Sequence, residues 1–354
     1  MNYYSKLIPL LFFMGPILFG QSIPQKIDSI AKSYYEKSGI GISIGFTQKN
    51  NEYYTAYGTL SKESDIEINK NSVFEITSIT KVITSMLIAQ AEMEGKLKIN
   101  DYIDSYLPKQ YVLSRNLKNR IKISDLASHQ SGLPDIDFRE LMAINPQQPV
   151  SNVTKASLAN LVNSCDALLD YGSYRYSTLG FTLLGQILET VYGKSYDILI
   201  HEKIVQPLKL TNTLTRDFEV PNRTKGYNPQ GGEQEFFNWN ITAPAGLIKS
   251  NASDMVTYLN ALLNTDSTFS KAAHLTETVT YSDENRNMGL GLIIIQDGDN
   301  TLYLKSGDSL GQSSMLCYSR RDQWGIIILL NHRNSSMRQE LLNDIYQVAL
   351  KDFK

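Results

Sequence analysis

The period of the hydrophobic positions changes several times along this chain. Residues 24–38 have the spacing of an amphipathic helix, and residues 39–46 then alternate as a strand does. Two further extended runs, 53–57 and 66–74, are expected to pair with that strand. The N-terminal part therefore predicts one helix followed by strands.

The C-terminal part returns to extended patterns rich in Ile, Leu and Tyr. A final helix with one apolar face is predicted over 335–350. The strands predicted before it cover 289–295, 302–305, 313–318 and 325–330. Their order along the chain predicts that they form the larger part of a sheet.

Between about 100 and 245, prolines punctuate the chain, which predicts loops and helices. A helix is predicted over 178–192, where Gly193 ends it. A second helix, over 253–263, is expected to have Ser250 or Asn251 as its cap.

Strands at both ends and helices in the middle predict an α+β fold. We expect an antiparallel sheet flanked by the N- and C-terminal helices, with a helical lobe inserted. The chain of 354 residues is long enough for one domain with two lobes. That single domain is predicted over 21–354, with the α/β lobe at about 21–100 and 245–354 and the helical lobe at about 101–244.

The first twenty residues differ from the rest. Lys6 precedes an apolar run over 7–19 that is too short for a spanning helix and fits a signal peptide cleaved after Gly20. An N-terminal membrane anchor is the alternative. We therefore predict an exported protein, periplasmic or secreted, without a stable membrane anchor after cleavage.

Composition excludes several classes of partner. The net charge is −2 and the basic residues are dispersed, so no nucleic-acid partner is expected. The four histidines form no H-E-x-x-H motif or Cys/His cluster, so neither a metal nor another cofactor is expected. Cys165 and Cys317 can pair in an exported protein, but two buried thiols are the simpler expectation. A monomer is expected.

Candidate chemistry begins with Ser78, which stands three residues before Lys81. Both open an amphipathic segment that is predicted to be helical and to end at Gly95. Residues i and i+3 are neighbours on a helix, and its N-terminus favours negative charge. An amine held against a hydroxyl is one way to activate a serine. S-x-x-K alone has low specificity, because short patterns of common residues arise by chance.

Three further segments contain candidate chemistry. Tyr176 precedes a predicted helix and can act as a base, although a core aromatic is the alternative. Lys305, at a strand end, can bind a substrate carboxylate, and Gly307 permits close approach of a ligand. The alternative for Lys305 is a solvated edge-strand lysine. Residues 128–134 are interpreted as structural, with His129 a hydrogen-bonded turn residue and a general base as its alternative.

These segments, in this order, resemble the penicillin-recognising serine hydrolases. The closer resemblance is to the class C β-lactamase branch, which also holds D-alanyl-D-alanine carboxypeptidases and serine esterases. The matching segments are Ser78-Ile79-Thr80-Lys81 for S-x-x-K, Tyr176-Ser177-Thr178 for Y-x-N apart from its last residue, Lys305-Ser306-Gly307 for K-T-G, Ser128 to Pro134 for S-H-x-S-G-L-P, and Ala245-Gly246-Leu247 with Ser253-Asp254-Met255 for A-G-G-L…D-M. The resemblance runs from about residue 25 to the C-terminus and implies the β-lactamase/transpeptidase-like fold.

The resemblance also implies roles. Ser78 is expected to be the nucleophile, Lys81 its neutral or proton-sharing partner, and Tyr176 the second member of the acid–base relay. Backbone N–H groups of Ser78 and Asp308 are expected to form the oxyanion hole. Which of Lys81 and Tyr176 takes the first proton stays open. The substrate-binding residues that it implies are Lys305, Ser306, Gly307, Asp308 and Thr178.

The function expected from this resemblance is hydrolysis of β-lactam or D-Ala-type amide substrates, small or derived from peptidoglycan, through an acyl-enzyme on Ser78. Thr178 replaces the usual asparagine of the branch, so substrate positioning is expected to be weaker or different. Lys305 favours substrates with a free carboxylate, and it is also expected to orient Tyr176. A carboxylesterase of the same fold and a non-catalytic penicillin-binding sensor are the alternatives.

A competing motif lies near the C-terminus. Residues 307–311 match G-x-S-x-G around Ser309, and Asp322 and His332 follow in the order found in α/β-hydrolases. That motif needs a strand, a turn and then a helix, whereas the residues that follow here predict strands. We therefore reject Ser309 as the nucleophile.

Overall fold

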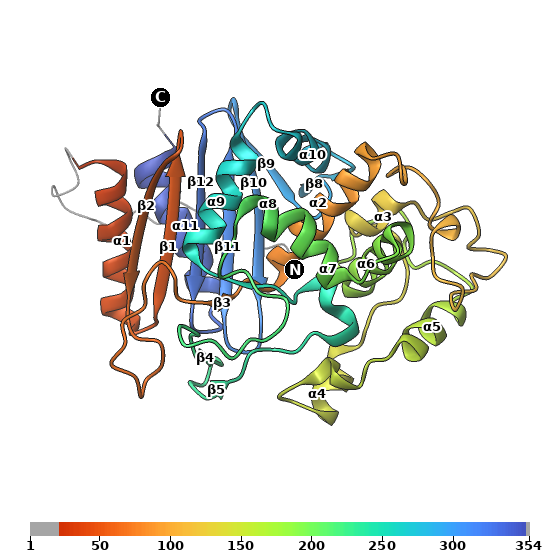
Figure 1. The fold of residues 1–354 in the computed structure, drawn as a ribbon, viewed down its shortest axis with the longest axis horizontal. Helices are drawn as coiled ribbons and strands as arrows, with labels where there is room; N and C mark the ends of the chain where they lie inside the picture. Colours follow the sequence, from red (N-terminus) through yellow and green to blue (C-terminus); the bar gives the residue numbers. More distant parts are fainter. Residues whose placement is uncertain (1–20, 352–354) are drawn as a thin grey trace.

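The computed structural model describes residues 21–351, so the predicted signal peptide lies outside the described range. Figure 1 shows a large sheet at one side of the molecule and a mainly helical region at the other. The helices are α1 Ile23–Ser38, α2 Thr80–Met93, α3 Ile123–Ala127, α4 Phe138–Ile144, α5 Lys155–Asn163, α6 Thr178–Tyr192, α7 Tyr196–Ile200, α8 Gln206–Leu208, α9 Ala252–Leu263, α10 Thr268–Glu277 and α11 Ser335–Ile345. The strands are β1 Ile42–Gln48, β2 Asn51–Tyr57, β3 Phe74–Glu75, β4 Gly226–Tyr227, β5 Glu233–Gln234, β6 Lys249–Ser250, β7 Tyr281–Asp283, β8 Arg286–Met288, β9 Ile293–Asp297, β10 Asn300–Asp308, β11 Ser313–Ser319 and β12 Trp324–Leu330.

Both ends of the chain build the main sheet. Within residues 21–351 its eight strands are antiparallel and follow the order β2-β1-β12-β11-β10-β9-β8-β7. Strand β1 lies between β2 and β12, and Ile42 pairs with Tyr57 on one side and Leu330 on the other. The predicted α+β fold with an antiparallel sheet is confirmed.

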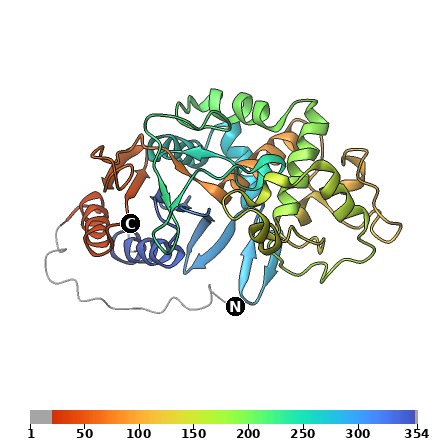
Figure 2. The ribbon, with the colours of Figure 1, turned by 90° about the horizontal axis from the view of Figure 1, so that it is seen from below.

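Helices cover both faces of this sheet. Ile326 and Ile328 of β12 belong to the apolar cluster of α1 and α11, whereas Ile327 and Leu329 belong to the cluster of α2, α6 and α9. Because both faces are buried, β12 is a nearly continuous apolar run rather than an alternating one. Figure 2 shows α1 and α11 together on one side of the sheet, as the flanking helices were predicted to lie.

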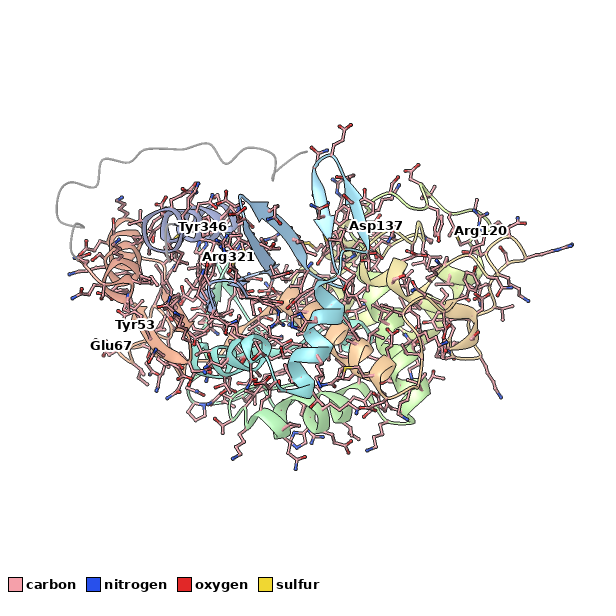
Figure 3. The ribbon with its side chains drawn as sticks, turned by 90° about the horizontal axis from the view of Figure 1, so that it is seen from above. Tyr53, Glu67, Arg120, Asp137, Arg321 and Tyr346 are labelled. Carbon is pink, nitrogen blue, oxygen red and sulfur yellow. The ribbon has the colours of Figure 1, made fainter. Side chains whose placement is uncertain are left out.

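The helical region occupies the middle of the chain. Helix α6 has the predicted bounds: the Ser177 side chain accepts a hydrogen bond from its first turn, and Gly193 ends it with a φ of 65°. In Figure 3, Arg120 marks the helical end of the molecule, and Tyr53 and Tyr346 lie at the sheet end. Helix α9 takes Asn251 as its cap, one of the two predicted residues.

Two strand predictions are wrong. Over 66–74 only the last residue joins a strand, and β3 pairs with β6 rather than with β1, because Asn69 and Ser72 form a hydrogen-bonded turn. Of the run 289–295, only 293–295 lie in a strand, β9, because residues 289–292 connect β8 to β9. There Gly291 has a φ of 72°, and a Cβ on it would lie 2.9 Å from the Lys81 carbonyl oxygen. The interruption therefore lets the backbone approach α2.

Two further expectations concern the membrane and the thiols. Within residues 21–351, no helix is both long enough and apolar enough to cross a bilayer. Over the same range Cys165 and Cys317 are unpaired, as expected, but only Cys317 is buried and Cys165 is half-buried.

Candidate active site

Ser78 lies in a single 3-10 turn, Thr77–Ile79, that leads directly into α2. Thr77 is buried and has a φ of 48°, a left-handed conformation that is costly for a β-branched residue. Strand β10 packs on this turn: a Cβ on Gly307 would lie 1.8 Å from Thr77 Oγ1 and 2.5 Å from the Ile76 carbonyl oxygen. Only glycine permits this approach, which brings the end of β10 beside Ser78.

The Ser78 hydroxyl meets the two side chains predicted to accompany it. Its Oγ lies 2.7 Å from the Tyr176 hydroxyl oxygen and 3.3 Å from Lys81 Nζ. Lys81 also donates a hydrogen bond of 2.7 Å to the carbonyl oxygen of Ala245, which orients its amine. Residues from the start of α2 and from the segment before α6 thus converge on one oxygen atom.

Burial changes the acid–base properties of Lys81. The side chain is only 1% exposed, and this burial lowers its pKa to about 7, while the negative charge of Asp135 opposes the shift. A substantial fraction of Lys81 is therefore neutral near pH 7. A neutral amine can accept a proton from Ser78, whereas an ammonium group cannot.

Lys305 is the second buried amine of the site. It lies in β10, between β9 and β11, so it is not the edge-strand lysine of the alternative interpretation. Its Nζ and that of Lys81 are each 4.9 Å from the centroid of the Tyr176 ring. Burial lowers the pKa of Lys305 to about 8, Tyr176 raises it, and Lys81 and Arg286 lower it. Lys305 is therefore mostly protonated at pH 7.

His129 supports the segment that carries Tyr176. Its Nδ1 accepts a hydrogen bond of 3.1 Å from the Ser177 N–H, and its carbonyl oxygen accepts one of 2.7 Å from the Arg175 N–H. Burial, followed by the charges of Lys305 and Lys81, lowers the pKa of His129 well below its usual value. His129 is thus a neutral, hydrogen-bonded turn residue, which confirms the structural interpretation.

Thr178 begins helix α6 and is buried. Its N–H lies 3.0 Å from both carboxylate oxygens of Asp135, and the Leu179 N–H donates to Asp135 at 2.7 Å. Asp135 was not among the residues predicted from the sequence. Its position directly after the turn segment 128–134 was the signal available.

Helix α11 contacts the end of β10 through a polar side chain. Arg338, which is buried, lies 2.6 Å from an oxygen of the Asp308 carboxylate and donates to the Gly307 carbonyl oxygen at 3.2 Å. Ser313 donates to the same Asp308 oxygen at 2.6 Å, and Ser306 is half-buried. Arg338 was also missed, although an arginine on the apolar side of a predicted helix is a signal for a buried polar contact.

The family described as Beta-lactamase matches residues 27–350, nearly the entire chain. The chain belongs to the beta-lactamase family.

Individual relatives of this family member are distant in sequence. Protein flp of Staphylococcus aureus strain N315 is 24% identical over 322 residues, which is 87% of this chain and 63% of that protein. A beta-lactamase of Providencia stuartii is 27% identical over 248 residues, covering 66% of this chain and 59% of that protein. The family member therefore spans less than two thirds of the length of these relatives.

Solved structures share the fold of this family member. The beta-lactamase/D-alanine carboxypeptidase from Pseudomonas syringae superposes with a TM-score of 0.81 at 19% identity, covering 92% of this chain and 98% of that one. A class C beta-lactamase from Rhodobacter sphaeroides has a TM-score of 0.79 at 20% identity, with coverage of 91% and 99%. The predicted β-lactamase/transpeptidase-like fold is confirmed.

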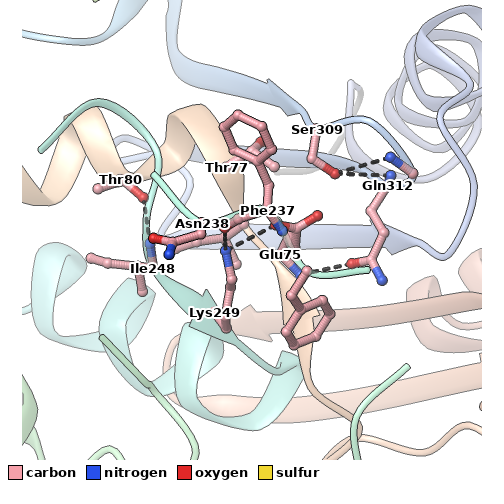
Figure 4. A network of polar contacts seen from close by, with 12 residues as sticks. Glu75, Thr77, Thr80, Phe237, Asn238, Ile248, Lys249, Ser309 and Gln312 are labelled. Carbon is pink, nitrogen blue, oxygen red and sulfur yellow. Dashed lines mark hydrogen bonds and ion pairs between the residues drawn. The ribbon is translucent and has the colours of Figure 1, made fainter. Parts of the chain in front are cut away.

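A buried ion pair fastens the segment before the Ser78 turn of this beta-lactamase family member (Figure 4). Lys249 Nζ lies 2.9 Å from Glu75 Oε1, and both side chains are essentially inaccessible. Lys249 donates to the Phe237 carbonyl oxygen at 2.8 Å, and the Phe237 N–H donates to Glu75 at 2.8 Å. The pair therefore joins the chain before Ser78 to the segment that leads to Ala245, the acceptor for Lys81.

The competing Ser309 motif has no hydrolase geometry in this family member. Ser309 is buried in the turn between β10 and β11, where its Oγ accepts hydrogen bonds from the N–H groups of Gly311 and Gln312. The context is strand, turn and strand, so the rejection of G-x-S-x-G is confirmed.

Within residues 21–351, no group of three His, Cys, Asp or Glu side chains is placed to hold a metal ion.

Proposed function

We propose that this protein is an exported serine hydrolase that forms an acyl-enzyme on Ser78 and acts on β-lactams or on amides of D-alanine. The observation that carries the proposal is the contact of Ser78 Oγ with the Tyr176 hydroxyl at 2.7 Å and with Lys81 Nζ at 3.3 Å. A hydroxyl held between an amine and a phenol can lose its proton as it attacks a carbonyl carbon.

The proton then moves within the pair Lys81 and Tyr176. As Ser78 Oγ bonds to the carbonyl carbon, its proton passes to this pair, which next protonates the leaving nitrogen. Water attacks the acyl-enzyme by the reverse route and regenerates the Ser78 hydroxyl. Both groups contact the Ser78 hydroxyl, so either can receive its proton.

The developing oxyanion is assigned to the backbone N–H groups of Ser78 and Asp308. The support is the packing of Gly307 on Thr77, which places the end of β10 against the Ser78 turn. One such donor contributes about 3–4 kcal/mol to transition-state stabilisation. The contact of Arg338 with Asp308 fixes this end of the strand.

Lys305 is assigned to the substrate carboxylate, with Ser306 beside it at the partly open end of β10. A protonated lysine next to the Tyr176 ring favours substrates with a free carboxylate, as β-lactams and peptides ending in D-alanine have. The names of the Providencia and Pseudomonas proteins support the same substrate class. Export is proposed from the predicted signal peptide over residues 1–20.

A carboxylesterase is the second candidate, and Thr178 favours it. Threonine offers one short hydroxyl where the class C branch has an asparagine amide, and the Thr178 N–H is already bonded to Asp135. Contacts to the amide of an acyl side chain are then weaker, which matters less for a simple ester than for a peptide.

The test exposes the mature protein, residues 21–354, to a penicillin, a D-Ala-D-Ala peptide and a p-nitrophenyl ester, and follows protein mass and product together. We expect a covalent adduct that disappears in Ser78→Ala and survives in Ser309→Ala. Turnover of the ester alone would favour the esterase, and an adduct that persists for hours would favour a penicillin sensor. Neither adduct nor turnover with any compound would contradict the proposal.

A further inference from the structure

The carboxylate of Asp135 caps the helix that follows Tyr176. Its Oδ1 accepts hydrogen bonds from the Leu179 N–H at 2.7 Å and the Thr178 N–H at 3.0 Å, and the Ser177 hydroxyl lies 3.4 Å away. Helix α6 is 15 residues long, so its N-terminus presents a substantial positive dipole to this carboxylate. Asp135 therefore fixes the first turn of α6.

Tyr176 lies between this cap and a second clamp. On the N-terminal side of Tyr176 the Arg175 N–H donates to the His129 carbonyl oxygen, and on its C-terminal side the Ser177 N–H donates to His129 Nδ1. The Tyr176 side chain itself is 43% exposed. Because so much of the ring is outside the core, the position of its hydroxyl depends on the backbone that Asp135 and His129 hold.

Charge is the second property of Asp135. The Lys81 amine faces the Tyr176 and Phe181 rings, and beyond the effect of burial its positive charge lowers the pKa of Lys305 and of His129, as the charge of Arg286 also does. Lys305 and Arg286 bring positive charge to this group, whereas Asp135 acts on Lys81 as a negative charge. Burial lowers the pKa of Lys81 and Asp135 raises it.

We propose that Asp135 is a positioning residue for the reaction at Ser78: it holds the Tyr176 hydroxyl in place through the α6 cap and supplies negative charge that balances the Lys81 ammonium. This inference rests on the proposed function, since it assigns to Asp135 a part in the chemistry of Ser78, Lys81 and Tyr176. The backbone N–H of residue 178 is one of the anchors of the Asp135 carboxylate.

Two substitutions separate the cap from the charge. Asp135→Asn keeps one oxygen that can accept from the Thr178 and Leu179 N–H groups, as Oδ1 does, but removes the negative charge. Asp135→Ala removes both. The matched controls are Asp137→Asn and Asp137→Ala, since Asp137 (labelled in Figure 3) caps α4 by accepting from the Arg139 and Glu140 N–H groups.

The measurement is the rate constant for inactivation by a neutral fluorophosphonate between pH 5.5 and 9, with thermal unfolding followed on the same samples. A neutral probe reports the reactivity of Ser78 without needing the natural substrate. For Asp135→Asn we expect the acid limb to move to lower pH by about half a unit, because Lys81 loses a solvent-screened negative charge. Its plateau rate should stay within about twofold of the wild type, since the cap remains.

For Asp135→Ala we expect the same shift and a plateau about tenfold lower, because a misplaced catalytic group costs at least that much. The Asp137 variants should change neither quantity. An unshifted limb in Asp135→Asn would overturn the electrostatic half of the inference, and an unchanged plateau in Asp135→Ala would overturn the positioning half. A wild-type protein that does not react at Ser78 would overturn the proposed function itself, and this inference with it.

Discussion

Two buried lysines lie at equal distance from the ring of Tyr176, and the proposed mechanism needs them in opposite protonation states. Lys81 is useful to Ser78 when it is neutral, and its pKa is about 7. Lys305 is useful to a substrate carboxylate when it is charged, and its pKa is about 8. Between these two values both conditions hold for a large part of the molecules.

This pair predicts a narrow pH optimum for substrates with a carboxylate. For a penicillin, kcat/KM should rise as pH increases through about 7, where Lys81 loses its proton, and fall above about 8, where Lys305 loses its own. Each limb should approach about tenfold per pH unit. For a neutral p-nitrophenyl ester, or for Lys305→Met, the fall above pH 8 should disappear. An alkaline limb that survives in Lys305→Met would contradict the role of Lys305.

His129 gives a second prediction at this scale, for stability. The folded protein keeps His129 neutral, whereas the unfolded chain protonates it below about pH 6.5. Stability should therefore fall as pH drops below about 6.5, by about 1.4 kcal/mol per pH unit from this residue. His129→Asn, which tolerates the φ of 64°, should remove that part of the slope in urea denaturation between pH 7.5 and 5. His274→Asn, at an exposed histidine, is the control that should keep the slope.

At the scale of elements, contacts between segments distant in sequence, rather than any one helix, position the residues of the candidate site. Glu75 and Lys249 are 174 residues apart, yet their ion pair joins β3 to the segment that positions Ala245. The Glu75 N–H also donates to the Gln312 side chain, in the turn between β10 and β11. One buried pair thus connects three segments that border Ser78.

Breaking this pair should cost both stability and reactivity. Lys249→Met leaves the Glu75 carboxylate buried without a counterion, and we expect a loss of about 3–5 kcal/mol in the free energy of unfolding. Acylation of Ser78 should slow at least tenfold, because Ala245 no longer holds Lys81 in the same place.

The control for Lys249→Met is Arg320→Met, which breaks the buried contact between Arg320 and Glu277 away from Ser78. It should lower stability and leave the acylation rate of folded protein unchanged. Equal loss of acylation in both variants would show that instability alone, and not position, explains the effect. Chemical denaturation and adduct mass, measured on the same samples, separate the two quantities.

Local spacing was enough to predict some elements and not others. Helix α6 and strands β11 and β12 follow from period and composition, because their residues interact mainly with near neighbours or are buried on both faces. The order of the motifs around Ser78, Tyr176 and Lys305 was also available from the sequence. The pairing of Glu75 with Lys249 and the cap at Asp135 were not, because contacts between distant segments leave no periodic signal in either one.

At the scale of the whole molecule, the sheet separates two apolar clusters, of which only one borders the candidate site. The cluster that includes Ile79, Val82 and Leu179 lies on the side of the site, whereas α1 and α11 cover the other face. Side chains on that second face, such as Leu341, contribute to stability without bordering Ser78.

Leu341→Ala tests this separation. Leu341 is fully buried between α11 and the sheet, so its truncation should cost about 2–5 kcal/mol of unfolding free energy through the cavity left behind. The rate constant of Ser78 acylation, corrected for the folded fraction, should stay within about twofold, because the folded state keeps its site geometry. A tenfold loss in the folded fraction would mean that the two faces are coupled through the sheet.

The pairing of β1 with β12 also has a consequence for synthesis. Strand β1 finds its second partner only when Trp324–Leu330 has been made, so the central sheet cannot close on a growing chain. Pairings between strands so far apart in the sequence form late and slowly, because the entropy cost of closing the long loop comes before the favourable contacts are made. Ser78 and Lys305 both lie in the chain between these two strands. A fragment that ends before residue 324 lacks this partner strand, so we expect it to show none of the proposed acylation of Ser78.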